Sequence, residues 1–497
     1  MGSRRDDIPV SQRVPIVLAA LSPDRPWGRM TQLARDHGVS RQTIYHMVAR
    51  GRAALSHALT PGRHGPHPPA TTVGVDRDRL VRGSVVLTEA GVSQRAIPRC
   101  VAELLDTSVS PSWVNAQLAQ VEAAATQVNQ GWRPAIGEGL SGDEMYSNGR
   151  PNLLVVGNES LYIYALTRQP DCGGDTWACV LWDAPDCPQF ASDAGLGLAA
   201  GVRLAQVGPH QLDWDHLLRP VWGQVARLDA QAYAALEACE ARRVQFEHAH
   251  TPKRLAQHWA AWERLNAEAQ AKVERADQFR QLAVQIDAEF GLIDPQTGDV
   301  RDPVRGAEHL RQVGRHLQGW AGGLYSKLSS YLVHLATGWF SYVPSLTRAL
   351  QPLQARWGLP AVRALARLWH CEAEAKRHPR TWPERQQSQR QWEACLDEVV
   401  ALIGLDQLGP AWANVTQVLE RAWRGSMLAE CVNSLLRSRL TRRKHTDQGC
   451  LELFRFLHNV RPFQRGKRAT HSPAQLVGLD VPDDPLTLLG LAPKVSI

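Results

Sequence analysis

The stretch SGDEMYSNGRPNLLVVGNESLYIYAL, residues 141–166, decides the fold of this chain. Two runs of apolar and aromatic residues, LLVV at 153–156 and LYIY at 161–164, are joined by the four residues GNES. Such runs around a short loop predict a β-hairpin. The preceding segment, which holds Asp143, continues the strand pattern, so residues 135–220 are expected to form an α/β core.

The next segments extend this core. A helix is expected near Thr176, followed by a strand in QFASDAGLGLAAGV, residues 189–202, that ends at Asp193. A further short strand is expected to end near Asp213. Asp143 and Asp193 thus both end β-like runs, where a surface charge is not required.

Residues 221–422 are predicted to be helical throughout. Apolar residues recur there at mostly three- and four-residue steps, which is the buried stripe of a helix. The clearest stripe consists of Trp262, Leu265, Ala269, Ala276, Phe279, Leu282, Ile286 and Phe290. Core packing is the expected role of most tryptophans in this region.

A third acidic residue, Glu430, lies in GSMLAECVNSLLRSRL, residues 425–440, which has the pattern of an amphipathic helix. Asn433, Ser434 and Arg437 are expected on its polar side, at offsets of three, four and seven residues. Leu428, Val432 and Leu435 are expected on its packing side. Glu430 then faces away from the apolar stripe.

The N-terminal region has the pattern of a helix-turn-helix in MTQLARDHGVSRQTIYHMVARGRAAL, residues 30–55. Leu33 and Ala34 belong to the first helix, Gly38 to the turn, and Ser40 is a candidate cap of the second helix. Val39, Ile44, Met47 and Val48 are expected on the buried side. Arg41, Gln42, Thr43 and His46 would then face the major groove of DNA. A helical hairpin without a DNA partner is the alternative.

The Pro- and Gly-rich stretch at residues 61–75 is expected to be a linker. Residues 76–130 resemble a second helix-turn-helix module, with Ser93 and Ser110 as candidate caps. Two linked DNA-binding modules would gain from effective concentration on one extended site.

Composition bounds the class of protein. Hydrophobic residues make up 44% and charged residues 21% of the 497 residues, which is typical of globular proteins. No apolar run approaches the roughly 20 residues of a membrane span, and the N-terminus lacks a secretory signal pattern. The nine cysteines form no C-x-x-C pair, so reduced thiols in a cytoplasmic protein are expected. A zinc site near Cys172, Cys179 and Cys187 is the alternative.

Positive charge is concentrated near the C-terminus. Residues 421–470 contain twelve Arg or Lys and three Asp or Glu, whereas the whole chain has a net charge of +7. The remainder is therefore slightly acidic. A basic surface beside a group of carboxylates suggests a polyanionic substrate, and a solvated basic helix without a ligand is the alternative.

Asp143, Asp193 and Glu430 are the candidate metal ligands. Three carboxylates from two strands and a helix can hold two Mg²⁺ ions against a phosphodiester, because hard cations prefer oxygen ligands. Each has a competitor nearby: Glu144 for Asp143, Asp183 and Asp186 for Asp193, and Glu420 for Glu430. Pro185 and Pro188 place Asp183 and Asp186 in a loop.

Together these motifs resemble the DDE transposases of bacterial insertion sequences. Asp143 and Asp193 are 50 residues apart, and Asp193 and Glu430 are 237 residues apart. The resemblance implies a ribonuclease-H-like core interrupted by a large all-helical insertion, as in the hAT and Mutator-like groups. In those groups a Cys or Asp is often followed three residues later by His, and Asp213 and His216 match that pattern.

The expected fold class is therefore multidomain and mainly α, with an α/β core and N-terminal helix-turn-helix modules. The expected parts are residues 1–60, a first DNA-binding domain; 61–75, a linker; 76–130, a second such domain; 135–220, the first half of the core; 221–422, the insertion; 423–480, the second half with a basic segment; and 481–497, a tail.

The resemblance also implies the chemistry. Asp143, Asp193 and Glu430 would bind two Mg²⁺ ions, with Mn²⁺ able to substitute, and Asp213, His216 and Arg437 would support them. Water would cleave the transposon end, and the freed 3′-hydroxyl would attack target DNA.

Partners follow from the same resemblance. Double-stranded DNA, as terminal inverted repeats and as target, and a homodimer or larger synaptic assembly are expected, with no membrane partner. Phosphate contacts are expected from the basic residues Arg442, Arg443, Lys444, Arg465, Lys467 and Arg468. A DNA-binding regulator with a dead site and a structure-specific nuclease remain alternatives.

Overall fold

The computed structural model describes residues 8–22, 26, 28–59, 75–182, 184, 187–377, 382–440 and 446–492. The chain divides into two compact units, Met1–Gly74 and Val75–Ile497. The predicted linker lies outside the described residues except for Val75. In the described part of the chain, no helix has the length and apolarity to cross a bilayer.

The first unit is a small helical domain. Its helices are α1 (Val10–Leu21), α2 (Arg29–Asp36) and α3 (Arg41–Leu59). The two helices predicted from the sequence, α2 and α3, are confirmed, and α1 is an additional element. Each helix contributes two fully buried residues to the core: Ile16 and Ala20, Leu33 and Ala34, and Ile44 and Val48.

The turn between α2 and α3 has the predicted chemistry. Gly38 adopts a φ of +61°, a conformation that a side chain disfavours. Ser40 caps α3, since its Oγ accepts a hydrogen bond from the backbone N–H of Thr43 at 3.1 Å. Both features fix the entry of the chain into α3.

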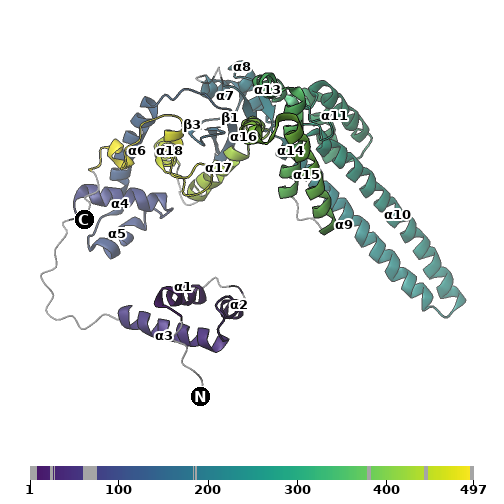
Figure 1. The fold of residues 1–497 in the computed structure, drawn as a ribbon, viewed down its shortest axis with the longest axis horizontal. Coiled ribbons are helices and arrows are strands. Elements are labelled where there is room, and N and C mark those ends of the chain that lie inside the picture. The colour runs from purple at the N-terminus through teal and green to yellow at the C-terminus, as the bar shows by residue number, and fades with distance from the viewer. Residues whose placement is uncertain are drawn as a thin grey trace. The chain divides into compact units, whose positions relative to one another are not determined.

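The second unit is mainly helical and contains one five-stranded mixed sheet (Figure 1). The strands are β1 (Leu140–Ser147), β2 (Arg150–Gly157), β3 (Ile163–Arg168), β4 (Phe190–Ser192) and β5 (His210–Leu212). Their order is β3-β2-β1-β4-β5. β2 is antiparallel to both β1 and β3, which confirms the predicted hairpin, and β1, β4 and β5 are parallel.

The register of the parallel strands aligns three aspartates. Ser141 pairs with Ala191, and Ser192 pairs with Leu212. Continuing these registers brings Asp143 level with Asp193, and Asp193 level with Asp213. The backbone N–H of Asp213 accordingly donates to the carbonyl of Ser192 at 2.8 Å.

Helices cover both faces of the sheet. α7 (Gly174–Leu181) and α8 (Leu196–Leu204) bury one face around Trp177, Phe190 and Leu198. α17 (Met427–Leu440) and α18 (Gln448–Val460) bury the other face, around residues such as Leu154 and Leu436. The predicted helix near Thr176 and the strand ending at Asp193 are therefore both present.

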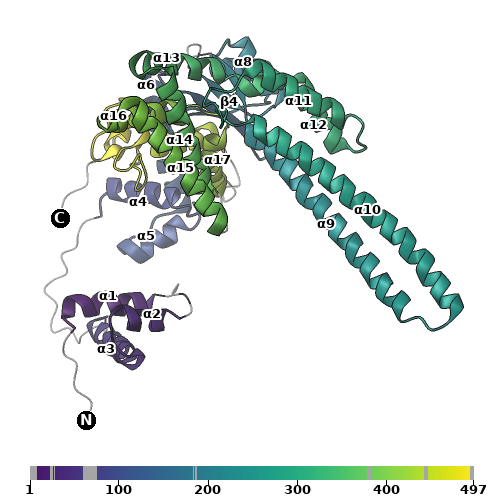
Figure 2. The ribbon, with the colours of Figure 1, turned by 45° about the vertical axis from the view of Figure 1, so that its right-hand side comes forward.

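A large helical block separates β5 from α17. It consists of α9 (Trp214–Glu247), α10 (Pro252–Glu289), α11 (Pro303–Leu317), α12 (Gly323–His334), the 3-10 helix η1 (Ala336–Phe340), α13 (Val343–Trp357), α14 (Leu359–Arg377), α15 (Trp382–Ile403) and α16 (Leu405–Glu420). α9 and α10 form a long antiparallel pair that extends away from the sheet (Figure 2). The predicted start of this block at Val221 is wrong, because α9 begins at Trp214 and runs through Pro220.

The remaining elements pack together, although the sequence placed them in three separate parts, residues 76–130, 423–480 and 481–497. α4 (Arg77–Glu89), α5 (Ile97–Leu105) and α6 (Pro111–Gly131) share a core with α18 and the 3-10 helix η2 (Pro485–Leu489). Leu489 and Leu491 are buried in it. The short helix α19 (Pro473–Leu476) also contacts α18. Residues 481–492 are therefore part of this core and not a free tail.

One of the two predicted caps in this region is correct. The Oγ of Ser110 accepts from the backbone N–H of Trp113 at 3.1 Å, at the start of α6. Ser93 does not cap α5, because that helix begins at Ile97 and follows Ala96. The backbone carbonyl of Ser93, and not its hydroxyl, accepts from the N–H of Ile97.

Candidate active site

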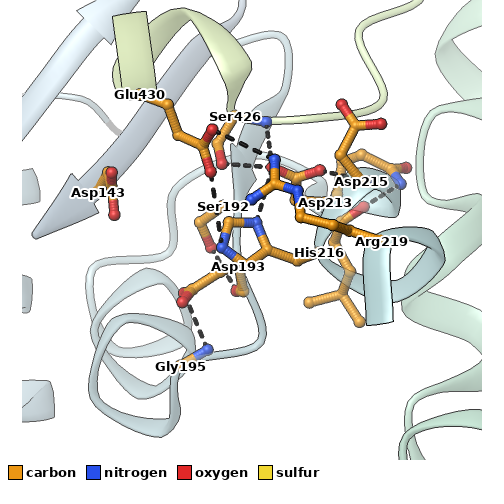
Figure 3. A network of polar contacts seen from close by, with 12 residues as sticks. Asp143, Ser192, Asp193, Gly195, Asp213, Asp215, His216, Arg219, Ser426 and Glu430 are labelled. Atoms are coloured by element: carbon orange, nitrogen blue, oxygen red, sulfur yellow. Dashed lines mark hydrogen bonds and ion pairs between the residues drawn. The ribbon is translucent and has the colours of Figure 1, made fainter. Parts of the chain in front are cut away.

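Asp143, Asp193 and Glu430 come from three different elements and surround one region (Figure 3). Asp143 lies inside β1 and not at the end of a strand as predicted, Asp193 follows the last residue of β4, and Glu430 lies in the first turn of α17. The structure thus brings together side chains that are up to 287 positions apart in the chain.

Asp143 is half-buried and held by two donors. Nδ2 of Asn433, on α17, donates to its Oδ2 at 2.7 Å, and the backbone N–H of Glu144 donates to its Oδ1 at 2.8 Å. Burial raises the pKa of Asp143, and the negative charges of Asp193 and Glu430 raise it further, against the lowering effect of the two hydrogen bonds. Asp143 therefore lies within electrostatic range of the other two carboxylates.

Asp193 ends its strand in a tight turn. Its Oδ1 accepts a hydrogen bond from the backbone N–H of Gly195 at 2.9 Å. The hydroxyl of the preceding Ser192 is bonded to the ring of His210 on β5, at 2.7 Å. These contacts orient the turn that leads into α8.

Glu430 lies beside an imidazole and a guanidinium of α9. Nε2 of His216 is 3.7 Å from its Oε1, and the guanidinium of Arg219 is 3.5 Å from its Oε2. The Arg219 side chain is 63% exposed, so this ion pair contributes little to stability. The position of Arg219 matters more than this stability, because it places a positive charge beside Glu430.

Asp213 is a structural anchor. Its side chain is fully buried and accepts from the backbone N–H of Asp215 at 2.8 Å, which caps α9. It also accepts from the backbone N–H and the hydroxyl of Ser426, at 2.8 and 2.6 Å, just before α17. Burial alone would raise the pKa of Asp213, but the bonds from His216 and Ser426 outweigh it and the pKa is lowered.

This anchor requires a glycine beside it. A Cβ at Gly425 would lie 2.8 Å from Oδ1 of Asp213, closer than a real Cβ contact allows. Because Gly425 has no side chain, the backbone can approach Asp213 closely enough for Ser426 to bond to it. The start of the helical block and the start of α17 are joined at this point.

His216 connects the anchor to Glu430. Its Nδ1 is 3.2 Å from Oδ2 of Asp213, and its Nε2 faces Glu430. The hydrogen bond to Asp213 raises the pKa of His216, although burial opposes it, and the nearby carboxylates raise it further. The Asp213–His216 pattern noted in the sequence therefore corresponds to a direct contact.

Glu144, the competitor of Asp143, lies on the other face of the sheet. Alternate residues of a strand point to opposite faces. Gly142 lies against Phe190 and Leu198 of the α7–α8 side, and Tyr146 is bonded to Cys172 there, so Glu144 between them shares that face. Burial, followed by the charges of Asp193 and Asp143, raises the pKa of Glu144 to about 7.

The packing side of α17 differs in part from its prediction. Ala429, Val432 and Leu436 are buried, whereas Leu435 is 53% exposed. Asn433, expected on the polar side, is 2% exposed because it contacts Asp143. The sequence placed Asn433 on the same side of the helix as Glu430 but gave it no role.

The predicted DNA-contacting residues fall into several groups. In the first unit, Arg41, Gln42 and His46 are exposed, and Thr43 is half-buried with its hydroxyl bonded to Ser40. Arg437 is exposed in the last turns of α17. Arg442, Arg443 and Lys444 lie outside the described residues, as do Asp183 and Asp186.

In the C-terminal segment, Arg465 and Lys467 are exposed, and the ammonium of Lys467 is 3.7 Å from Glu420. The guanidinium of Arg468 instead donates to the backbone carbonyls of Glu159 and Asn158, at 2.5 and 3.1 Å. Arg468 therefore holds the β2–β3 loop.

The donor chemistry of the site fits a hard divalent cation. All three converging side chains offer carboxylate oxygens, and their mutual repulsion is the environment that a cation relieves. Across the described ranges, however, no three or more His, Cys, Asp or Glu side chains form a group that could hold an ion. Glu430 is directed toward His216 and Arg219 in this arrangement.

Comparison with known proteins adds no constraint: the chain matches no protein-family model and no curated protein. The convergence of Asp143, Asp193 and Glu430 is therefore the observation from which a function is inferred.

Proposed function

We propose that this chain is a DNA transposase of the DDE type, which cuts the ends of a mobile element and joins them to target DNA. One observation carries the proposal. Asp143 and Asp193 lie level on neighbouring parallel strands, and Glu430 reaches the same region after a helical block of roughly 200 residues.

The fold supports a ribonuclease-H-like core. The antiparallel hairpin beside parallel β1, β4 and β5, with helices on both faces, has the layers such a core requires. The helical block enters after β5 and leaves before α17, which is where an insertion would separate the second and third carboxylates.

Bound divalent ions would activate the attacking oxygen and stabilise the leaving oxygen of a phosphodiester. Asp143, Asp193 and Glu430 would hold these ions. Asn433 would orient Asp143, and Asp213 would keep the starts of α9 and α17 together. His216 and Arg219 would set the direction of Glu430 until it turns toward a ligand.

The first unit would recognise the ends of the element. Arg41, Gln42 and His46 lie on the exposed side of α3, in the position of a recognition helix. Because two ends must be joined to one target, a dimer or larger assembly is expected. The reaction would take place on bacterial DNA in the cytoplasm.

Product analysis tests this proposal against its alternatives. The purified chain is incubated with Mg²⁺, target plasmid and DNA that carries the sequences flanking its gene. A transposase yields end DNA joined covalently to the plasmid. Cleavage of branched DNA without joining would indicate a nuclease, and end binding without cleavage would indicate a regulator; either result contradicts the proposal.

A further inference from the structure

Two cysteines of the helical block lie in contact. The Sγ atoms of Cys371, on α14, and Cys395, on α15, are 3.9 Å apart. Both side chains are half-buried, and α14 and α15 pack against each other.

The distance is short enough for a covalent bond after a small movement. The S–S bond of a disulfide is about 2.05 Å, so the sulfur atoms need to approach by roughly 2 Å. Rotation of the two side chains can supply much of this movement, because each thiol is carried by a single Cα–Cβ bond.

The surroundings of Cys371 decide the order of attack. Burial, followed by the proximity of Cys395, raises the pKa of Cys371 to about 11. The charge of Arg367, which is paired with Glu398, opposes that rise without reversing it. Ionisation of Cys371 is therefore disfavoured, and Cys395 is the expected attacking thiol.

Two other cysteines contact groups that are not thiols. Cys187 donates to the carbonyl of Gln189 and Cys172 contacts the hydroxyl of Tyr146. Cys179 and Cys431 are exposed and serve as internal references for general thiol reactivity.

We propose that Cys371 and Cys395 form a reversible intramolecular disulfide with glutathione disulfide as the oxidant. The Cys395 thiolate attacks one sulfur of glutathione disulfide and releases one glutathione thiol. Cys371 then loses its proton and attacks the Cys395 sulfur of the mixed disulfide, which releases the second glutathione. Two protein thiols are oxidised, one glutathione disulfide is reduced, and both protons end on glutathione.

The bond would tie together two helices that also pack on α16. Arg424 follows α16 and donates to the carbonyl of Phe290 at 2.7 Å, a short distance before Ser426. The disulfide would thus hold α14 and α15 together. These helices pack on α16, which precedes the segment that leads to Glu430.

Peptide mapping of the full-length chain tests the disulfide. After incubation in glutathione disulfide, the intact mass should fall by about 2 Da, the two hydrogens of a two-electron oxidation. A peptide that links Cys371 to Cys395 should appear and should be lost on reduction. Cys431→Ser should give the same crosslink, whereas Cys371→Ser and Cys395→Ser should not.

The order of attack gives a second readout. Cys371→Ser should accumulate glutathione on Cys395 faster than Cys395→Ser accumulates it on Cys371. Equal or reversed rates would overturn the assignment of Cys395 as the attacking thiol. Modification confined to Cys179 and Cys431, with no crosslinked peptide from the wild-type chain, would overturn the disulfide itself.

Discussion

At the scale of single residues, the site contains two aspartates with opposite environments. Asp213 is fully buried and has four donor contacts, which lower its pKa. Asp143 is crowded by Asp193 and Glu430, and its pKa is raised, with burial as the largest cause. Asp213 is bonded like a structural group, and Asp143 is the carboxylate to which the proposed function gives a metal ion.

This contrast predicts unequal effects of neutralisation. Asp213→Asn should lower the free energy of unfolding by about 2–4 kcal/mol, because the variant loses acceptors for buried donors. Asp143→Asn should lower it by less than about 1 kcal/mol in the absence of divalent ions, because the removal of a like charge offsets the loss of an acceptor for Asn433.

Urea unfolding of both variants and of the wild-type chain in a chelating buffer measures these effects. Equal destabilisation by the two substitutions would show that Asp143 is also structural, and would contradict the assignment of separate roles.

His458 makes a separate prediction about pH. Its Nε2 donates to the carbonyl of Leu161 at 2.9 Å, and burial lowers its pKa to about 4, with Arg439 and Arg461 acting in the same direction. An unfolded histidine titrates near pH 6.5. Between these values the unfolded chain binds more protons, so this stability is present above pH 6.5 and is lost as the pH falls toward 4.

His458→Gln keeps a donor but does not titrate. The stability difference between the wild-type chain and this variant should therefore shrink below pH 6.5, with a slope of at most about 1.4 kcal/mol per pH unit. Unfolding measured at several pH values between 4 and 7 tests this. A difference that stays constant over that range would contradict a buried neutral imidazole.

Single residues also show what the sequence could predict of the site. Asp143 and Asp193 were recognisable because each adjoins a run of strand-forming residues, and Glu430 because it lies off the apolar stripe of a helix. The prediction that Asp143 ends its run is wrong, because β1 continues to Ser147. Asn433 was not recognisable, since an asparagine three residues along a helix has the same pattern whether it faces solvent or a strand. Its burial depends on the approach of α17 to β1, which residue spacing does not encode.

At the scale of elements, local periodicity predicted helices and strands better than it predicted their partners. The hairpin β2–β3, the helix α7 and the strands β4 and β5 lie where the pattern placed them. The sequence did not predict that α4, α5 and α6 pack against α18 and η2. An apolar stripe predicts which face of a helix is buried but not which element packs against it.

The C-terminal residues of this cluster are predicted to be essential for its stability. Leu489→Ala should cost about 2–4 kcal/mol, the range for removing a buried leucine side chain. Leu104→Ala, on α5 of the same cluster, should cost much less because Leu104 is 72% exposed. Denaturant unfolding compares them, and similar losses would contradict the packing of residues 481–492 described above.

At the scale of the whole molecule, recognition and chemistry are assigned to different units. The candidate recognition helix α3 belongs to the first unit, and the three carboxylates belong to the second. The division falls at the end of the Pro- and Gly-rich stretch, residues 61–75, which the sequence predicted to be a linker. Residue spacing alone could not predict how the three carboxylates are arranged. No pattern in the helical block determines where the chain comes back to the sheet after it.

The division predicts that binding and cleavage can be separated. Arg41→Ala combined with His46→Ala should weaken binding to end DNA by at least about tenfold, given roughly 1–3 kcal/mol for a base contact. Arg52→Ala, an exposed substitution further along α3, should have a smaller effect. Titration by fluorescence anisotropy measures both, and equal weakening would indicate that α3 supplies charge without specificity.

The central claim is that Glu430 joins Asp143 and Asp193 in holding the ions that cut DNA, and a change of metal preference tests it most directly. Cleavage of end DNA is measured for Glu430→Cys in Mg²⁺ and in Mn²⁺, beside Glu420→Cys, whose glutamate is a partly exposed rival. A thiolate suits a transition-metal ion better than it suits Mg²⁺.

The account predicts that Glu430→Cys loses at least about a hundredfold of its rate in Mg²⁺ and regains much of it in Mn²⁺, while Glu420→Cys behaves as the wild-type chain in both ions. Full activity of Glu430→Cys in Mg²⁺, or the same Mn²⁺ rescue at Glu420, would contradict the claim.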